Sequence, residues 1–268
     1  MPLEESDVAA LAIFISAERL AALSALTGSA RAAIELHQDT LRLGAALMHV
    51  TGTIEIALRN AVCENLNQHF GAPNWLLQPP APFTWRAPEQ GKVQQALSSA
   101  RRSEYAKLSQ AEKAALDAVA FPNGLPHNLS HSTRSKRRQD KIPVSTGKIV
   151  AELTLFFWKR LYGPEYDHNL WRTTLKRTFP DKTLKRATVA THLERVYQSR
   201  NRLAHHEPVV SQRFLDTLDS VNFILDHLGP STPGVATPLR KLLTDDVAAL
   251  SAQGQALHDR LDAYRVGP

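Results

Sequence analysis

The sequence predicts an all-α protein, and three features of it support this. Long segments place apolar residues at the spacing of one helix face, no segment alternates apolar and polar residues as a strand would, and prolines and glycines gather between the apolar segments. A chain of 268 residues can bury a substantial core. We expect one domain over residues 1–268, with N-terminal helices at about 1–120, a helical core at about 145–230 and a C-terminal helical appendage at 235–268.

In the N-terminal half, apolar periodicity predicts three helical segments. These cover residues 7–26, 30–70 and 89–119. Ser16 is a plausible N-cap within the first segment, which then forms one or two short helices, and Gly28 ends it. Gly44 and Gly52 in the second segment indicate a kink or close helix packing. Five prolines in residues 71–88 break the periodicity and predict a loop.

The loop at 71–88 carries three large aromatic residues, Trp75, Phe83 and Trp85. They are interpreted first as anchors that hold a long loop against the body of the protein. A second interpretation is that they are stacking platforms for nucleic-acid bases.

In the C-terminal half, the same periodicity predicts five helical segments after an irregular stretch. The irregular stretch is 121–146, and the helical segments are 145–162, 164–180, about 188–206, 214–228 and 239–264, with a linker at 229–234. Ser145 or Thr146 caps the first helix, which is apolar nearly all round and should be deeply buried. Thr191 and Glu194 have capping-box spacing and offer a later start for the third helix, which should end before Pro208.

Basic residues are concentrated in one region of the sequence. Residues 127–206 contain 17 Lys or Arg and 6 Asp or Glu, a net charge of +11, whereas the whole chain carries +6. This asymmetry favours a site for a polyanion over an ordinary solvated surface. Lys136, Arg137 and Arg138 in the densest basic run, together with Arg202, are the expected contacts to an RNA backbone. A mobile solvated loop is the alternative interpretation of the run.

A charged residue occupies a core position near the end of the 188–206 helix. At 100° per residue, Arg200 falls near the centre of the apolar arc of that helix. Burying an unpaired guanidinium is costly, so either a carboxylate neutralises it or the arc lines a site for an anion. Asn201 and His205 lie one turn apart beside this arc. Arg200, Asn201, His205 and, as second choice, His206 are therefore the candidate catalytic residues.

The sequence Arg200-Asn201-x-x-x-His205 followed by His206-Glu207-Pro208 resembles the signature of the HEPN ribonucleases, and in particular of the Abi-like abortive-infection branch. Residues 54–60 and 149–158 resemble the first-half and central motifs of that branch, in the same order. The resemblance covers roughly residues 16–230. It implies a HEPN-like helical bundle with additional N-terminal helices.

The resemblance also implies an activity. HEPN ribonucleases cleave RNA without a metal or other cofactor, leave a 2′,3′-cyclic phosphate, and place two copies of the motif across a shared cleft, usually in a homodimer. On this basis we expect a metal-independent endoribonuclease, a hydrolase acting in antiviral defence or as a growth-arresting toxin, with RNA as its partner and an antitoxin or a small RNA as a further one. The roles implied are phosphate binding by Arg200, acid or base catalysis by His205, and orientation by Asn201.

Three further charges are predicted to lie inside the fold. Glu55 and Arg59 fall within the apolar arc of the 30–70 helix, and Glu152 lies within the apolar 145–162 helix. Buried charges need partners, so a network that joins these residues, or joins them to Arg200, is expected.

Other classes of function are less well supported. A single cysteine, Cys63, excludes an intramolecular disulfide and a cysteine-rich zinc site, and adjacent helical residues such as His205 and His206 do not converge on one metal ion. Acidic residues at the N-terminus and the absence of an apolar run of membrane length favour a cytoplasmic protein without membrane association. Two rivals remain: a non-catalytic RNA-binding or regulatory protein of the HEPN fold, and an α-helical interaction scaffold.

Overall fold

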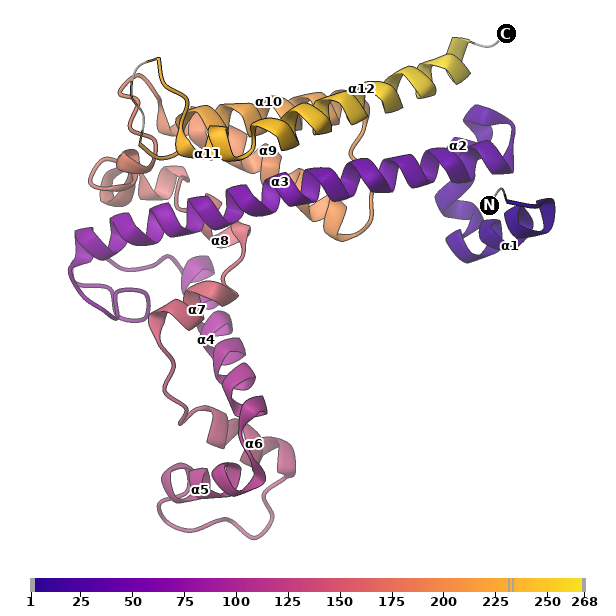
Figure 1. Cartoon of the computed structure of the whole chain (residues 1–268). Helices are drawn as coiled ribbons and strands as arrows, with labels where there is room; N and C mark the ends of the chain where they lie inside the picture. The colour runs from indigo at the N-terminus through magenta and orange to yellow at the C-terminus, as the bar shows by residue number, and fades with distance from the viewer. Residues whose placement is uncertain (1–2, 231, 233, 267–268) are drawn as a thin grey trace. The chain divides into compact units, whose positions relative to one another are not determined.

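The computed structural model describes residues 3–230, 232 and 234–266 (Figure 1). Within this range every extended regular element is a helix, and the remaining backbone pairing is an isolated bridge between Thr232 and Val235. The prediction of an all-α protein is confirmed. Ser231 and Pro233 of the predicted 229–234 linker lie outside the described residues.

The helices follow one another with short connections. Those of the first half are α1 (Glu5–Ile15), α2 (Ala17–Thr27), α3 (Ala30–Phe70), α4 (Ala87–Lys107), α5 (Gln110–Ala120) and α6 (His131–Gln139). Those of the second half are α7 (Thr146–Glu152), α8 (Leu155–Arg160), the short turns η1 (Pro164–Tyr166), η2 (Asp167–Trp171) and η3 (Leu175–Thr178), α9 (Arg186–Ala204), α10 (Ser211–His227), α11 (Pro238–Leu242) and α12 (Thr244–Val266).

The chain forms two compact units that interleave in the sequence. The first comprises Met1–Ala61 and Lys176–Pro268, and the second comprises Val62–Leu175. One boundary falls within α3 and the other within η3. The units therefore differ from the predicted segments at 1–120, 145–230 and 235–268, because helices distant in sequence share one core.

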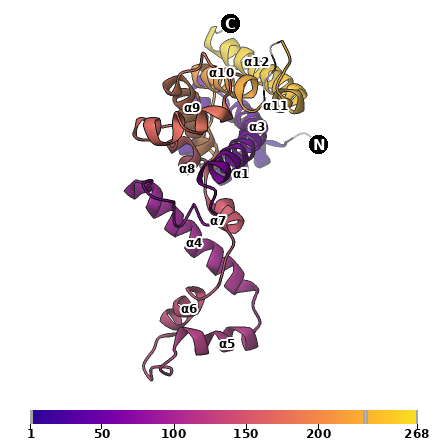
Figure 2. The ribbon, with the colours of Figure 1, turned by 90° about the vertical axis from the view of Figure 1, so that its left-hand side faces the viewer.

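The first unit is built around the N-terminal part of α3. Helix α9 packs on α10, and α12 packs on α10 and α2 (Figures 1 and 2). Gly44 permits a close approach of α3 and α9, because a Cβ added there would lie 3.1 Å from Leu203 Cδ2. Of the two interpretations of this glycine, close packing is confirmed, and α3 continues through it as a single helix.

The second unit contains α4 with α7 and α8 against it, and α5 and α6 at the far end of α4 (Figures 1 and 2). Its predicted loop aromatics are buried in a cluster. Phe83 lies 5.2 Å from Phe70 and 4.9 Å from Trp85 between ring centroids, and Trp75 is fully buried. The interpretation of Trp75, Phe83 and Trp85 as anchors is confirmed, since buried rings do not offer a face to a base.

Several predicted helices are interrupted by caps. The predicted 145–162 helix breaks after Glu152, where Leu153 and Thr154 are extended, and α8 begins after Thr154, whose side chain makes no capping hydrogen bond. The 89–119 segment breaks at Ser109, which forms a capping box with Glu112. The stretch predicted to be irregular at 121–146 contains α6, whose N-terminus is capped by the Ser130 hydroxyl.

Helix α3 has the length and apolar composition of a membrane span, with a mean hydropathy of 1.2 over its most apolar 18-residue window. Core helices of soluble proteins meet the same criterion. The fully buried residues of α3, such as Leu47, Ile54 and Leu58, repeat at helical spacing along one face, and 33% of the apolar window is buried. The cytoplasmic location stays a prediction.

Candidate functional site

Helix α9 carries the Arg-Asn-x-x-x-His motif in its last two turns, in the first unit. Val189, Leu193 and Val196 form its buried stripe against the core. Ser199 continues this stripe, and its Oγ lies 2.6 Å from Thr217 Oγ1 of α10. The apolar stripe and this buried polar contact fix the rotation of α9, and thereby the directions of the motif side chains that follow.

Arg200 has a carboxylate neighbour and is partly open to solvent. Its Nε lies 3.4 Å from Glu55 Oε2 of α3, and 31% of the Arg200 side chain and 14% of the Glu55 side chain are exposed. Of the two alternatives predicted for a charge at this position, the carboxylate partner is present. The anion site stays a prediction, and part of the guanidinium reaches water. The pair is partly solvated, so its net contribution to stability is small.

The turn after α9 determines where the two histidines lie. Helix α9 ends at Ala204, His205 is its C-cap, and His206 follows in the left-handed region with a φ of +56°. The N–H of His206 donates to Leu203 O at 2.9 Å, and the N–H of Glu207 donates to Arg202 O at 2.8 Å. These two bonds are those of a Schellman motif, which normally has glycine at the left-handed position. Both histidine side chains are exposed.

Two arginines hold this turn from either side. Arg19 of α2 donates from Nη1 to the carbonyl of His206 at 3.0 Å. Arg202 forms an ion pair with Glu207 at 2.9 Å, and its Nε is buried with no hydrogen-bond partner. Asn201 is half-buried. The end of α9 and its C-terminal turn thus carry a cation, an amide and two imidazoles within the seven residues 200–206.

The predicted network of buried charges is only partly present. Glu55 is largely buried and paired, and Arg59 is half-buried with its Nε lacking a hydrogen-bond partner. The prediction that Glu152 is buried is wrong, because it is exposed at the end of α7. The prediction assumed an unbroken helix over 145–162, and the break at Leu153 leaves Glu152 in a terminal turn.

A more deeply buried carboxylate, Glu89, was missed. It lies in the first turn of α4, is 1% exposed, and accepts hydrogen bonds from Arg160 Nε at 2.6 Å and from the Tyr166 hydroxyl at 2.7 Å. Burial raises the pKa of Tyr166 above its usual value, and the bond to Glu89 raises it further. The signal was in the sequence, since Glu89 precedes Val93 and Leu97 at helical spacing on the buried face of α4.

The basic run in α6 divides into structural and exposed residues. Arg134 and Arg138, one turn apart, both bind the Asp117 carboxylate of α5, with Arg138 Nη2 at 2.6 Å from Oδ2. Arg138, followed by Arg134, holds the pKa of Asp117 well below its usual range. Only 11% of the Arg138 side chain is exposed, so it offers little to a phosphate, whereas Lys136 and Arg137 are exposed.

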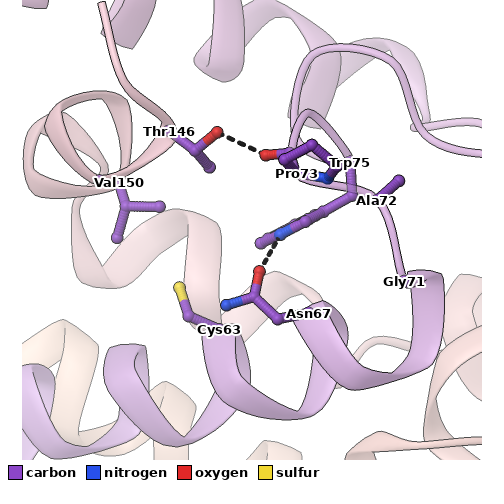
Figure 3. Close-up of a pocket in the computed structure, with 9 residues that line it drawn as sticks. Cys63, Asn67, Gly71, Ala72, Pro73, Trp75, Thr146 and Val150 are labelled. Atoms are coloured by element: carbon purple, nitrogen blue, oxygen red, sulfur yellow. Dashed lines mark hydrogen bonds between the residues drawn. The ribbon is translucent and has the colours of Figure 1, made fainter.

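A pocket of about 570 Å³ lies in the second unit between the end of α3, the following loop and α7 (Figure 3). The Asn67 amide oxygen accepts from the Trp75 indole, and the Thr146 hydroxyl donates to Pro73 O at 2.8 Å. The Cys63 thiol also faces this pocket. The amide, the indole and the hydroxyl are thus engaged in hydrogen bonds within the second unit.

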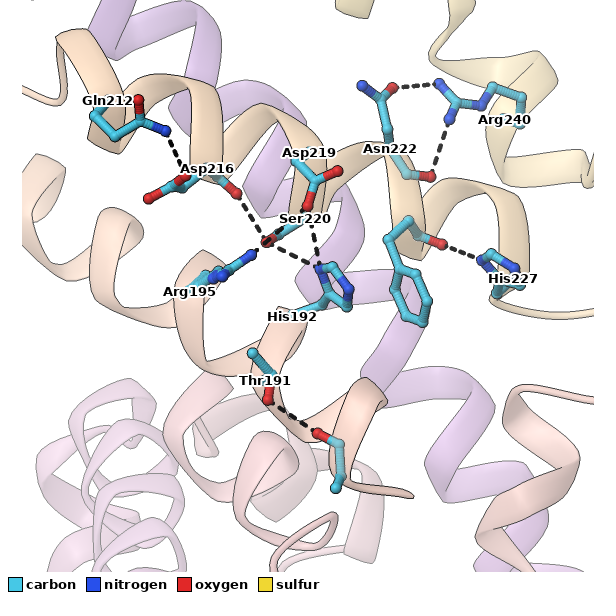
Figure 4. A network of polar contacts seen from close by, with 12 residues as sticks. Thr191, His192, Arg195, Gln212, Asp216, Asp219, Ser220, Asn222, His227 and Arg240 are labelled. Carbon is cyan, nitrogen blue, oxygen red and sulfur yellow. Dashed lines mark hydrogen bonds and ion pairs between the residues drawn. The ribbon is translucent and has the colours of Figure 1, made fainter. Parts of the chain in front are cut away.

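Helices α9 and α10 also bring a histidine and a serine together (Figure 4). His192 Nδ1 lies 3.1 Å from Ser220 Oγ and 3.9 Å from Asp219 Oδ2, and the imidazole stacks on Phe223 at 3.9 Å between centroids. Ser220 is fully buried and donates to Asp216 O. A buried serine that shares one histidine nitrogen with the aspartate does not form a hydrolase triad, in which the two imidazole nitrogens face different partners.

Among the described residues, no group of three or more His, Cys, Asp or Glu side chains is arranged to hold a metal ion. No family model, no curated protein and no solved structure matches this chain. The resemblance to the HEPN ribonucleases therefore rests on the residues of the three sequence motifs.

Proposed function

We propose that this protein is a metal-independent endoribonuclease of the HEPN type, acting in Abi-like antiviral defence or toxin-type growth arrest. The observation that carries the proposal is the end of α9, where a partly exposed Arg200 and an exposed His205 belong to the same two turns. Metal-free RNA cleavage requires a cation for the phosphate, a base and an acid, and this turn supplies the cation and one group that transfers protons near neutral pH.

The proposed reaction is an internal transfer. The 2′-oxygen of a ribose attacks the adjacent phosphorus, a base removes the 2′-proton, the bond from phosphorus to the 5′-oxygen breaks, and an acid protonates that oxygen. The products are a 2′,3′-cyclic phosphate and a 5′-hydroxyl. Arg200 stabilises the charge on the phosphate oxygens, His205 acts as the acid or the base, and Asn201 orients one of them.

Because the acid and the base must be two different groups, we propose that the active site is assembled from two copies of the chain. His206 is displaced from His205 by the left-handed turn, so the second group is proposed to come from a second copy of the chain. A two-fold dimer would bring two motif ends together across one cleft. Light scattering at micromolar concentration checks this, and a monomer that retains cleavage would remove the composite site from the proposal.

The alternative function is a non-catalytic RNA-binding or regulatory protein of the same fold. The Arg200–Glu55 pair favours it, because a guanidinium with a carboxylate neighbour is a common structural arrangement. In that case Lys136 and Arg137 would contact an RNA backbone, and nothing would be cut. The two functions differ in cleavage and agree in salt-dependent RNA binding.

The deciding experiment measures cleavage of labelled RNA by purified protein in excess EDTA. Wild-type protein should leave a 2′,3′-cyclic phosphate, and His205→Ala should lower the rate by roughly 10²- to 10⁴-fold while RNA binding survives. Arg200→Ala should also lose cleavage, and Arg200→Lys should recover little, because an ammonium cannot reproduce the guanidinium fork. Arg195→Ala is the matched control, since Arg195 is an exposed arginine of the same helix.

Each other outcome has a distinct meaning. Cleavage that disappears in EDTA and returns with a divalent ion refutes the mechanism. Undiminished cleavage by His205→Ala points to a contaminating nuclease. RNA binding without cleavage in the wild type establishes the alternative, and the absence of both leaves the interaction scaffold.

A further inference from the structure

The first unit contains a cavity of about 940 Å³ beside the turn that ends α9. Its walls come from α2, α3, the 206–210 turn and α12, and most of the surface is aliphatic. Leu23, Leu41, Met48, Leu203 and Leu261 contribute to it. Pockets for small organic ligands measure roughly 300–1,000 Å³ and combine such apolar walls with a few placed polar groups. The cavity has the size and lining of a ligand site.

His37 supplies the polar group that points to a ligand. It lines the cavity from α3, is only 8% exposed, and its Nδ1 has no hydrogen-bond partner. Burial lowers the pKa of His37, and the positive charge of Arg19 lowers it further, so the imidazole is neutral near pH 7 and carries one N–H donor. A buried polar atom without a partner is unfavourable. Nδ1 itself is buried, so a rotation of the imidazole would bring it to a ligand atom in the cavity, which would satisfy it.

Arg19 gives the cavity a positive group close to His37. Its Nη1 binds the His206 carbonyl, and it makes no ion pair with a carboxylate of the described residues, which leaves the rest of the guanidinium fork for a ligand. Two carboxylates also line the cavity. Glu207 is compensated by Arg202 at 2.9 Å, whereas Glu18 would repel an anion that lay close to it.

We propose that this cavity binds a small amphipathic carboxylate. The alkyl part lies against the aliphatic walls, and the carboxylate accepts hydrogen bonds from Arg19 and from His37. The cavity is lined by His206, the second-choice catalytic residue, but not by Arg200, Asn201 or His205, and the proposal does not depend on RNA cleavage. The occupant of the cavity would nevertheless contact the turn that carries His206 and Glu207, so binding would stiffen the end of the motif helix.

The test is calorimetric titration of the full-length protein with decanoate below its micelle-forming concentration. We expect saturable binding of one decanoate per chain and binding of decanol at least tenfold weaker, because an alcohol lacks the charge. Arg19→Gln should weaken decanoate about tenfold, as the loss of a charged hydrogen bond does. Glu18→Gln should strengthen it, because the opposing charge is removed.

Two further variants locate the site. Leu41→Trp introduces an indole from a position that is 37% exposed, so it should fill the cavity and abolish binding without unfolding the protein. Leu215→Trp is the matched control, because Leu215 is exposed and lines a different, smaller pocket between α10 and α12. His37→Leu keeps the volume and removes the hydrogen bond. If it does not fold in a thermal melt, Arg19→Gln and Leu41→Trp carry the test.

Four results would overturn the proposal. They are the absence of saturable decanoate binding, equal affinity for decanol and decanoate, unchanged affinity in Arg19→Gln, and binding that survives Leu41→Trp but is lost in Leu215→Trp. The titrations measure decanoate binding and not RNA cleavage, so a failure of this proposal can be distinguished from a failure of the proposed ribonuclease activity.

Discussion

The two histidines at the end of α9 have opposite backbone requirements, and exchanging each for glycine should change stability in opposite directions. His205 has a φ of −98°, which any residue adopts, whereas His206 has a φ of +56°. A left-handed conformation costs an L-residue roughly 1–2 kcal/mol, and the extra freedom of an unfolded glycine costs about 0.5–1 kcal/mol. Both side chains are exposed, so lost packing contributes little. His206→Gly should therefore stabilise the protein by about 0.5–1 kcal/mol, and His205→Gly should destabilise it by a similar amount.

Urea unfolding measures both changes, as shifts of the midpoint at constant slope. His206→Ala is the control, because it removes the imidazole and keeps the left-handed Cβ, so it should unfold close to the wild-type midpoint. The bond from Arg19 to the backbone carbonyl of residue 206 is retained in all variants. The strain argument fails if His206→Gly is no more stable than His205→Gly.

The same two variants separate stability from activity. If His205 transfers the proton and His206 only shapes the turn, His205→Gly should lose cleavage and His206→Gly should keep most of it while gaining stability. Loss of cleavage in the more stable His206→Gly would instead identify His206 as the second proton-transfer group. Cleavage of labelled RNA at matched protein concentrations distinguishes these results.

Three further predictions concern the cores of the two units. Glu89→Gln should lower the free energy of unfolding by about 2–3 kcal/mol, because a neutral amide leaves the Arg160 charge uncompensated and offers one acceptor oxygen where the carboxylate offers two; an unchanged urea midpoint would contradict this. Gly254→Ala should cost about 1–3 kcal/mol, since its Cβ would overlap the Phe214 ring, whereas Gly52→Ala, with open space, should gain up to about 1 kcal/mol. Burial lowers the pKa of His192, so protonation favours the unfolded chain. Stability should be full above the ordinary pKa of 6.5 and fall as the pH drops below it, with a smaller fall in His192→Asn when unfolding is compared at pH 7.5 and pH 5.

The helices and the location of the motif could be predicted from the sequence because they depend on local periodicity. The turn after the motif could be predicted only in part from the sequence. Pro208 correctly indicated that α9 stops by His206, but the left-handed position of a Schellman motif is usually marked by glycine, and here it is a histidine. The hydrogen bonds of the turn and the bond from Arg19 hold it, and neither is visible in a local sequence pattern.

The buried charges show a second limit of periodicity. Helical spacing gives the direction of a side chain relative to its neighbours only while the helix is continuous. It succeeded for Glu55 because α3 is unbroken, and it failed for Glu152 because α7 ends there. It would have identified Glu89 if applied to α4. Helical spacing does not identify the partner of a buried charge. Arg160, for example, lies 71 positions from Glu89 and is brought to it by tertiary packing.

Arg200 illustrates why a partner does not by itself decide between scaffold and active site. The ion pair with Glu55 engages Nε, on one edge of the guanidinium, whereas a phosphate is bound most strongly by two parallel N–H donors. The edge formed by the two Nη atoms is distinct from the Nε position, so a carboxylate can orient the side chain while that edge faces the solvent. Lysine has a single ammonium and cannot be oriented by one anion and bind another with the same geometry. A lysine at position 200 that preserved stability and abolished cleavage would thus separate the positioning of Arg200 by Glu55 from its action on the phosphate, and a lysine that preserved both would assign Arg200 to the scaffold.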